Sequence, residues 1–428
     1  MKHYRLAPWK NPRALFLSFA FPALILTSIS IWPLATNTNF GRNTPTSGEG
    51  SALSVPAPGG DAWSAHKPHP GEPTLARGPA PLQTRDWGLK AVNATEAWKL
   101  IENENEPEKR EIVVAVIDTG ADITHPDLRD HLWTNPGESG KDDRGRDKAT
   151  NGIDDDGNGL VDDVHGWNFA TEDADLTDMH GHGTHIAGIV RGVAPNAKIM
   201  VLKYFDPTVS GTNPLASTIT AFEYATRMGA KIINYSAGGP RPNRLELEVL
   251  RLAETFGVLV VAAAGNEASN SDRQAYYPAD YDLPNILSVT ATDPWRKILP
   301  TSNYGKRSVD IAAPGEAILS SVPGGFRATM TGTSQATAFA TGAAALLLSQ
   351  RPDLTDPAEV IDQLVLSGEH VGALAGKTRE QTVLNTYRAL ALQDRGTSAS
   401  GIKARNTEGL DEIFTLDGPT VKPETMTP

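Results

Sequence analysis

"EIVVAVIDTG", residues Glu111–Gly120, is the first strong strand pattern along the chain. It is a β-branched apolar run that ends in a glycine turn, which is typical of a strand buried on both faces of a sheet. Four further runs of the same kind follow it along the chain: "AKIMVLKYF", "AKIINYSA", "VLVVAAAGN" and "NILSVTATD". The sequence therefore predicts several strands in the interior of one sheet.

Helical patterns lie between these runs. In "RLELEVLRLAETFG" the apolar residues fall on one helical face, and Gly257 ends the pattern. That face consists of Leu245, Val249, Leu252, Ala253 and Phe256. Strands that alternate with helices predict an α/β fold, with a doubly wound, mostly parallel sheet flanked by helices in a single catalytic domain. In such sheets, functional residues collect just beyond the carboxyl ends of the strands.

Composition excludes several classes of function. The chain has 428 residues with 39% hydrophobic residues and 31 prolines, which indicates an enzyme-sized globular unit with loose flanks. A net charge of −12 without a basic stripe argues against nucleic acid as a partner. Cysteine is absent from the sequence, so disulfides, thiol catalysis and thiolate metal sites are excluded.

The N-terminus indicates a compartment. A basic start, "MKHYRLAPWKNPR", precedes an uncharged segment from Ala14 to Ala35. Residues 1–36 are therefore predicted to be a signal peptide or a signal anchor, since about 20 apolar residues can span a bilayer. Pro33 is a poor residue for a cleavage site, and a buried core helix is the third alternative. Basic residues before the segment place the body outside the cytoplasm, either secreted or membrane-anchored.

The flanks differ from the body in composition. Residues 37–84 are rich in Pro, Gly, Ser and Thr without an apolar period, which predicts a disordered linker. Residues 394–428 are predicted to be a disordered polar tail. The strand and helix patterns lie between them, so residues 85–393 are expected to form the folded domain.

Three histidines crowd the stretch "MHGHGTHIAGIV", which begins at Met179. They are His180, His182 and His185, and they could be metal ligands, a catalytic base or a polar helix entry. A zinc site of this kind needs a carboxylate inside the helical spacing, as in H-E-x-x-H, but Gly183 and Thr184 fill that gap. The remaining alternatives are a catalytic base and a polar start of a helix without a chemical role.

Asp118 and Ser334 each have an ordinary structural explanation. Asp118 enters a glycine turn, and Ser334 begins the small-residue helix of "TMTGTSQATAFATGAAALLLSQ", so both could be caps. Together with a histidine, however, they supply what acyl transfer to a hydroxyl requires. The order Asp, His, Ser along the chain is one known solution to this geometry.

Several stretches of the sequence resemble those of a known protein family. Four stretches, "VIDTGADITHPDL", "HGTHIAG", "AAGN" and "GTSQATA", resemble signatures of the subtilisin (subtilase) family of serine proteases and occur in the family's order. "WGLKAVNATEAW" is similar to the start of a mature subtilase domain, and "VLNTYRAL" to its closing helix. The resemblance covers residues 86–392.

The resemblance implies a role for each matching residue. Asp118 would be the orienting acid, His182 the base and Ser334 the nucleophile of a serine endopeptidase that forms an acyl-enzyme. Asn266 of "AAGN" would complete the oxyanion hole with the backbone N–H of Ser334. The alternative is a catalytically silent, membrane-tethered subtilase fold that binds peptides.

Within "NYSAGG", the resemblance assigns substrate binding to Ser236, Ala237 and Gly238. An exposed main chain at this place would pair with an extended protein or peptide substrate, largely independently of the substrate's sequence. The sequence predicts neither a particular specificity nor an oligomeric state.

The acidic loop, "NGIDDDGNGLVDDVHGW" at residues 151–167, has the spacing of half an EF-hand. The predicted ligands of a structural Ca²⁺ are Asp154, Asp156, Asn158 and Asp162. His165 stands where an EF-hand has its last glutamate, so the motif is incomplete. A solvated acidic loop is the alternative, but close carboxylates repel one another without a cation.

The chain departs from the subtilase pattern in two ways. Gln335, Ala338 and Phe339 replace the methionine and the Pro-His pair that commonly follow the nucleophile, which removes no catalytic group. Residues 37–84 carry too little patterned hydrophobicity for the folded pro-domain that secreted subtilases usually have. The route of maturation therefore stays open.

Overall fold

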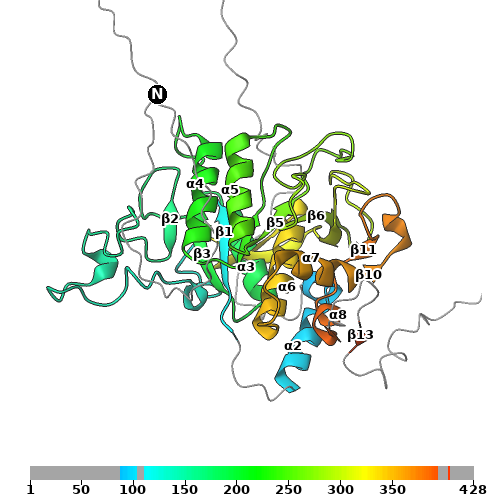
Figure 1. Ribbon diagram of the computed structural model, residues 1–428, viewed down its shortest axis with the longest axis horizontal. Coiled ribbons are helices and arrows are strands. Elements are labelled where there is room, and N and C mark those ends of the chain that lie inside the picture. The colour runs from blue at the N-terminus through cyan, green and yellow to red at the C-terminus, as the bar shows by residue number, and fades with distance from the viewer. Residues whose placement is uncertain (1–86, 104–109, 394–402, 405–428) are drawn as a thin grey trace, which may run out of the picture. The chain divides into compact units, whose positions relative to one another are not determined.

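The computed structural model describes residues 87–103, 110–393 and 403–404 (Figure 1). The predicted signal or anchor segment (1–36) and the predicted linker (37–84) lie outside the described residues, as does nearly all of the predicted tail (394–428). Among the helices that are described, none combines the length and the apolar character needed to cross a membrane.

A nine-stranded sheet organises the described residues, in the order β10–β11–β7–β6–β5–β4–β1–β3–β2. Every neighbouring pair is parallel except β10 with β11. In chain order the strands are β1 (Val113–Asp118), β2 (Gly166–Asn168), β3 (Lys198–Lys203), β4 (Ile232–Tyr235), β5 (Leu259–Ala263), β6 (Ile286–Thr292), β7 (Ile311–Pro314), β10 (Glu369–His370) and β11 (Thr382–Val383). The predicted α/β fold with a mostly parallel sheet is confirmed.

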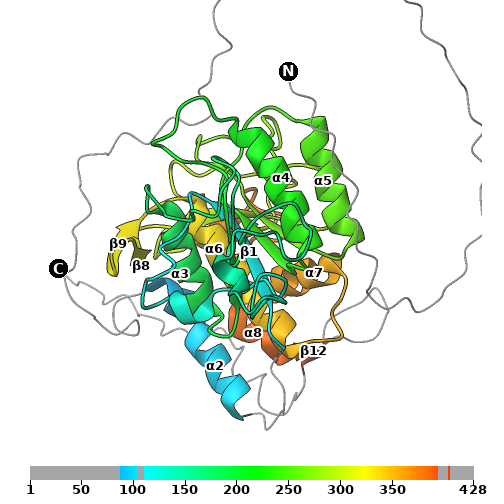
Figure 2. The same cartoon turned by 90° about the vertical axis from the view of Figure 1, so that its left-hand side faces the viewer.

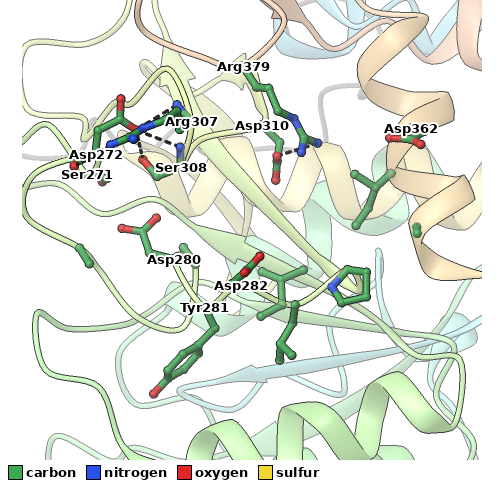
Figure 3. Close-up of a pocket in the computed structure, with 17 residues that line it drawn as sticks. Ser271, Asp272, Asp280, Tyr281, Asp282, Arg307, Ser308, Asp310, Asp362 and Arg379 are labelled. Carbon is green, nitrogen blue, oxygen red and sulfur yellow. Dashed lines mark hydrogen bonds and ion pairs between the residues drawn. The ribbon is translucent and has the colours of Figure 1, made fainter.

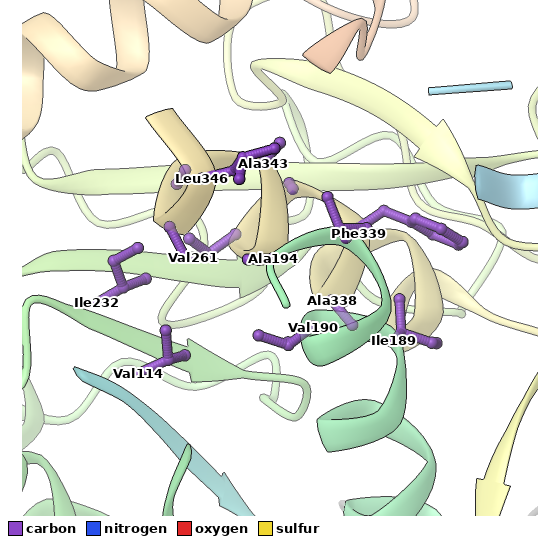
Figure 4. Packing of buried hydrophobic residues seen from close by; sticks show 14 of the residues in the cluster. Val114, Ile189, Val190, Ala194, Ile232, Val261, Ala338, Phe339, Ala343 and Leu346 are labelled. Atoms are coloured by element: carbon purple, nitrogen blue, oxygen red, sulfur yellow. The ribbon is translucent and has the colours of Figure 1, made fainter. Parts of the chain in front are cut away.

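One face of the sheet packs against two helices whose first turns contain predicted site residues. Val114 and Val116 of β1 belong to the core on this face, together with residues of α3 (His182–Val193) and α6 (Thr333–Gln350). Figure 4 shows Val114 on the sheet below these helices. α6 is buried along almost its whole length, as expected of a helix that is apolar on all sides. At Gly342 an added Cβ would lie 2.6 Å from Val193 Cβ, so a small residue is needed where the two helices meet.

The opposite face is covered by α4 (Pro214–Arg227) and α5 (Arg244–Thr255), which lie side by side in Figures 1 and 2. Ala115 and Ile117, the alternate residues of β1, point to this side. Because both faces are covered, the central strands read as continuous apolar runs.

The predicted apolar face of α5 is partly wrong. Leu245 and Phe256, at its two ends, are 58% and 53% exposed. The buried residues of the helix are Glu246, Leu250 and Ala253. The helix therefore presents a face rotated from the predicted one, with Glu246 accepting a hydrogen bond from the Tyr281 hydroxyl at 2.9 Å.

The remaining elements flank this core. The helices are α1 (Trp87–Ala91), α2 (Ala94–Asn103), α7 (Pro357–Leu366) and α8 (Thr386–Ala391), with 3₁₀ turns at Arg129–His131, Lys148–Thr150 and Gly372–Leu374. β8 (Ile318–Val322) and β9 (Phe326–Met330) form a separate antiparallel pair, as do β12 (Leu392–Gln393) and β13 (Lys403–Ala404). The predicted closing helix corresponds to α8, which packs against α2.

The predicted site residues gather where strands end and helices begin. Asp118 is the last residue of β1, and Ser236 directly follows β4. Asn266 lies in the turn after β5. His182 is the first residue of α3, and Ser334 is the second residue of α6. The carboxyl edge of the sheet is thus the place to look for chemistry, as expected for this class of fold.

Candidate active site

Asp118 and His182 form a hydrogen-bonded pair. The imidazole Nδ1 lies 2.8 Å from Oδ1 and 3.0 Å from Oδ2 of the carboxylate, which is 3% exposed. Burial lowers the pKa of His182, but the Asp118 carboxylate, its hydrogen bond and the charge of Asp178 together outweigh burial and raise the pKa above its ordinary value. With Nδ1 bound to Asp118, the other ring nitrogen is left to accept a proton.

Ser334 is held by the turn after β4. Its hydroxyl donates to the carbonyl oxygen of Ser236 at 3.1 Å, and the Ser236 hydroxyl donates back to the carbonyl of Ser334 at 3.3 Å. In the described part of the chain, no hydrogen bond joins Ser334 to His182. Catalytic hydrogen bonds often form in full only when substrate binds, so this resting arrangement is compatible with a nucleophile.

Asn266 is oriented by Thr333, the residue that precedes Ser334. Its Oδ1 accepts hydrogen bonds from the backbone N–H of Thr333 at 3.0 Å and from the Thr333 hydroxyl at 3.2 Å. These contacts leave the carboxamide nitrogen as a donor beside the start of α6. The backbone N–H of Ser334 is in the first turn of that helix, where amides lack intrahelical partners. Two donors and the positive end of a helix dipole therefore stand next to the serine.

The turn after β4 is packed rather than open. Ser236 and Ala237 are 7% and 8% exposed. Gly238 has no room for a side chain, because a Cβ there would meet the Tyr276 ring and the carbonyl of Tyr277. Of the three predicted substrate-binding residues, Ser236 also exchanges hydrogen bonds with Ser334, which its position in the sequence did not reveal.

The other two histidines have different surroundings. His185 is fully buried in α3, and its Nε2 contacts the carbonyl oxygens of Ile318 and Ala328 at 3.0 and 3.1 Å. Burial, followed by the nearby His182, lowers its pKa to about 4, so this ring is neutral at physiological pH. The ring of His180 lies on the incoming loop, 6.2 Å from the ring of His182. His182 is the histidine that contacts Asp118.

The acidic loop contributes to a second group of charged residues. Glu138, Asp156 and Asp163 each direct one carboxylate oxygen to a common place, with those oxygens within 4.8 Å of one another. We call these three residues the carboxylate cluster. Glu138 and Asp163 are 0% exposed. Such a group of hard oxygen donors is the chemistry that Ca²⁺ prefers.

The predicted calcium ligands divide between two roles. Asp154 accepts hydrogen bonds from three backbone N–H groups, those of Gly157, Asn158 and Gly159, at 2.7–3.1 Å. Asp162 accepts one from the N–H of Gly152, so both side chains hold the backbone of the loop. Asp156 belongs to the carboxylate cluster, and the structure does not bring Asp154 or Asp162 into that group.

Asn158 reaches the carboxylate cluster through its amide. Its Nδ2 donates to Asp156 at 3.2 Å and to Asp163 at 2.9 Å. Tyr224 of α4 also donates its hydroxyl to Asp163, at 2.5 Å. Asn158 therefore supplies hydrogen bonds to the cluster in this structure, whereas the sequence predicted it as an oxygen ligand.

Glu138 was missed by the sequence analysis. Its Oε1 accepts a hydrogen bond from the N–H of Asp155 at 2.8 Å, while its Oε2 is buried without a partner. Burial, together with the neighbouring carboxylates, raises the pKa of Glu138 to about 7. Burial likewise raises the pKa of Asp163 to about 6. Glu138 precedes the acidic loop, and no motif connects it to the loop in sequence.

A pocket of about 530 Å³ is lined by residues from the stretches 271–286, 307–310 and 358–362 and by Arg379 (Figure 3). Asp310 and Arg379 on its wall form an ion pair of 2.9 Å, and Asp272 accepts hydrogen bonds from the backbone of Arg307 and Ser308. None of the predicted catalytic, oxyanion or metal residues lines it. The pocket is therefore not part of the site formed by Asp118 and His182.

An acid–imidazole pair and a serine at a helix start, all at the carboxyl edge of a doubly wound sheet, define a serine hydrolase. The Subtilase family profile matches residues 109–397. The chain belongs to the subtilase family, and its fold and family are those of a serine endopeptidase.

Three relatives illustrate the match. A thermophilic serine proteinase from Bacillus sp. (strain AK1) is 34% identical over 260 residues, which are 58% of this chain and 55% of that relative. This chain therefore spans about half the length of that protein. Thermitase from Thermoactinomyces vulgaris is 31% identical over 320 residues, 72% of this chain and 97% of thermitase. The major intracellular serine protease of Bacillus subtilis (strain 168) is 34% identical over 274 residues, 61% and 74% of the respective chains.

Proposed function

We propose that this chain hydrolyses peptide bonds in proteins through Asp118, His182 and Ser334, by way of an acyl-enzyme. The observation that carries the proposal is the 2.8 Å hydrogen bond between His182 Nδ1 and the buried Asp118. A carboxylate on Nδ1 fixes the tautomer that leaves Nε2 as a base. A serine at the start of a helix on the same sheet edge then serves as the nucleophile.

The chemistry follows from these positions. His182 Nε2 removes the proton of the Ser334 hydroxyl as the oxygen attacks the scissile carbonyl, and Asp118 stabilises the resulting imidazolium. The oxyanion receives hydrogen bonds from the backbone N–H of Ser334 and from the Asn266 carboxamide. His182 then returns the proton to the leaving amine. Water, activated by the same imidazole, releases the acyl group from Ser334.

Substrate binding would use the main chain of residues 236–238. This turn lies directly beside the nucleophile, since the Ser236 carbonyl accepts the Ser334 hydroxyl hydrogen bond. An extended peptide that pairs with it would place its scissile bond at Ser334. Recognition through main-chain hydrogen bonds predicts broad rather than narrow specificity, for protein or peptide substrates.

A structural calcium ion fits the carboxylate cluster. Three carboxylates converge there, and Glu138 Oε2 is buried with no protein donor. Ca²⁺ binds six to eight oxygen atoms, and carboxylates are its commonest protein ligands. Glu138, Asp156 and Asp163 would hold the ion, while Asp154 and Asp162 would shape the loop around it. The ion would stabilise the loop and take no part in peptide hydrolysis.

We place the enzyme outside the cytoplasm. The basic start and apolar segment of residues 1–36 support this placement, as a cleaved signal or as an anchor. One of the similar proteins, by contrast, is named an intracellular protease. Fractionation of cells that express the full-length chain, followed by external protease treatment, tests the placement.

Digestion of fluorescently labelled casein tests the catalytic proposal. The full-length chain should release label, and Ser334→Ala should not. Ser210→Ala is the matched control, because Ser210 is an exposed serine in a loop. Equal activity of Ser334→Ala and the control would overturn the proposal, and folded but inactive wild-type protein would favour the catalytically silent alternative.

A further inference from the structure

Asp178 lies four residues before His182 and is 4% exposed. Its two carboxylate oxygens accept five hydrogen bonds. The donors are the Thr119 hydroxyl (2.9 Å), the backbone N–H groups of His180 (3.0 Å), Gly181 (2.7 Å) and Thr184 (2.8 Å), and the Thr184 hydroxyl (2.6 Å). A buried carboxylate with this many donors is fully satisfied and fixed in position.

Asp178 caps the helix that carries the base. α3 begins at His182, and the N-cap residue Gly181 has no side chain to cap it. The first amides of a helix lack intrahelical partners, so an outside acceptor must satisfy them. Asp178 accepts from the N–H groups of Gly181 and Thr184, which lie on either side of His182. A negative charge at this end of a helix is also favoured by the helix dipole.

Thr119 connects this cap to the orienting acid. Its backbone N–H donates to Asp118 Oδ1 at 2.8 Å, and its hydroxyl donates to Asp178 Oδ1 at 2.9 Å. The same hydroxyl accepts the N–H of Gly183 at 3.0 Å. Asp118 and the first turn of α3 are therefore tied together through one threonine and Asp178.

The loop that carries Asp178 is itself anchored to the end of β3. Lys203, which is 1% exposed, pairs with Asp118 in the register of β1 and β3. Its ammonium donates to the carbonyl of Thr177 at 2.7 Å and forms an ion pair with Asp206 at 2.7 Å. The residue before Asp178 is thus fixed to the strand next to the catalytic acid.

We propose that Asp178 is a positioning residue for the base: it fixes the first turn of α3 so that the His182 imidazole meets Asp118, and it places a second negative charge near that imidazole. The inference rests on the proposed role of His182. Asp178 does not contact the reacting atoms, so it acts only through His182 and Thr119.

The charge of Asp178 has a separate, measurable consequence. The titratable or charged groups around His182 are Asp118, Asp178, His180, His185 and, beside Asp118 on β3, Lys203 paired with Asp206. Removal of the Asp178 charge takes away one of the two anions that favour the imidazolium, which lowers the pKa of His182. The acid limb of the reaction then moves to lower pH, whereas simple loss of folded protein would lower the rate equally at every pH.

The test is the pH profile of the reaction rate with a fluorophosphonate probe, measured on the full-length chain and corrected for the labelled fraction. Asp178→Asn keeps the shape of the side chain but turns one acceptor oxygen into a donor. The plateau rate should fall by about 10- to 100-fold, because charge-assisted hydrogen bonds to α3 are lost. The acid limb should shift to lower pH.

Asp175→Asn is the matched control. Asp175 lies in the same loop and accepts hydrogen bonds from the N–H and hydroxyl of Thr177, but it accepts none from α3. Its rate and pH profile should equal those of the wild type. If Asp178→Asn does not fold, Thr119→Val removes the link between Asp178 and Gly183 and should lower the plateau rate by about 3- to 10-fold.

The outcomes separate the two claims. A lower plateau and a shifted acid limb in Asp178→Asn, with Asp175→Asn unchanged, support the inference. A folded Asp178→Asn, or Thr119→Val in its place, that reacts as fast as the wild type overturns it while the proposed function stands. Absence of labelling in the wild type overturns both.

Discussion

Two buried carboxylates, Asp178 beside the active site and Glu138 in the carboxylate cluster, are both removed from water but are satisfied in different ways. Asp178 accepts five hydrogen bonds from its own chain. Glu138 accepts one, and its second oxygen has no partner. The first carboxylate has its hydrogen-bond donors within the protein. The second has a pKa raised to about 7, first by burial and then by neighbouring carboxylates.

The difference shows what each region requires. Around His182, the chain supplies all the hydrogen-bond donors that the buried carboxylates need. The positions of these carboxylates are therefore fixed without a bound ion. In the carboxylate cluster, Asp156 and Asp163 accept hydrogen bonds from the chain, but Glu138 Oε2 has no donor. Burial of such a group is costly unless it is protonated or binds a cation. Substitutions in the first region should therefore change the rate, and those in the second should change calcium-dependent stability.

The largest effect is expected in the first region, at Asp118. Asp118→Asn removes the charge that holds the His182 tautomer, so kcat should fall by about 10⁴-fold, the order of magnitude found when the orienting acid of a serine-protease triad is lost. Casein hydrolysis with and without calcium is the measurement. A reduction that calcium reverses would contradict the independence of the two regions, because catalysis would then depend on calcium binding.

Asn266→Ala should follow in size. It removes one of two oxyanion donors while leaving the Asp118–His182 pair intact, so kcat should fall by about 10²- to 10³-fold, the size seen for this donor in subtilisin itself. Steady-state kinetics with a chromogenic peptide separate kcat from KM. A loss confined to KM would place Asn266 in substrate binding and not in the oxyanion hole.

The rate should also depend on pH through His182. The pKa of this imidazole is raised above its ordinary value of about 6.5, and the protonated ring cannot act as a base. Activity should therefore be constant at high pH and fall by about tenfold per unit as the pH drops below the raised pKa. An acid limb below pH 6 in the wild type would contradict the electrostatic account of the pair.

The smallest effect is expected in the second region, and on stability alone. Calcium at about 100 times its Kd should raise the melting temperature of the full-length chain by about 5 °C. Glu138→Gln should abolish this increase without lowering the rate at saturating calcium. Glu248→Gln, which alters an exposed ion pair with Arg244, is the matched control and should keep the increase. An unchanged calcium response in Glu138→Gln would show that the carboxylate cluster is not the calcium site.

The central strands were predictable from sequence because burial on both faces leaves a continuous apolar run. β1 is such a run, and its alternate residues do enter two separate cores. α5 was predicted as a helix but with a rotated face, because the periodic pattern includes Leu245 and Phe256, which are exposed at its ends. The spacing of apolar residues alone does not determine which side of a helix packs against the sheet.

The candidate site was predictable only as far as local motifs extend. Asp118 and His182 lie in separate motifs that the sheet edge brings into contact. Asp178 was overlooked because an aspartate before a helix is common, and only its buried position distinguishes it from an ordinary cap. Glu138 was overlooked because its partners Asp156 and Asp163 follow it by a loop whose path the sequence does not show.

Mapping the residue that reacts with a fluorophosphonate is a direct test of Ser334 as the nucleophile and His182 as its base. The full-length wild-type chain would be labelled at neutral pH, digested and analysed by mass spectrometry. We expect one phosphonylated residue, Ser334, and no adduct in His182→Ala, which keeps the serine but lacks the base. An adduct on a different serine, or equal labelling of Ser334 in the absence of His182, would contradict this expectation.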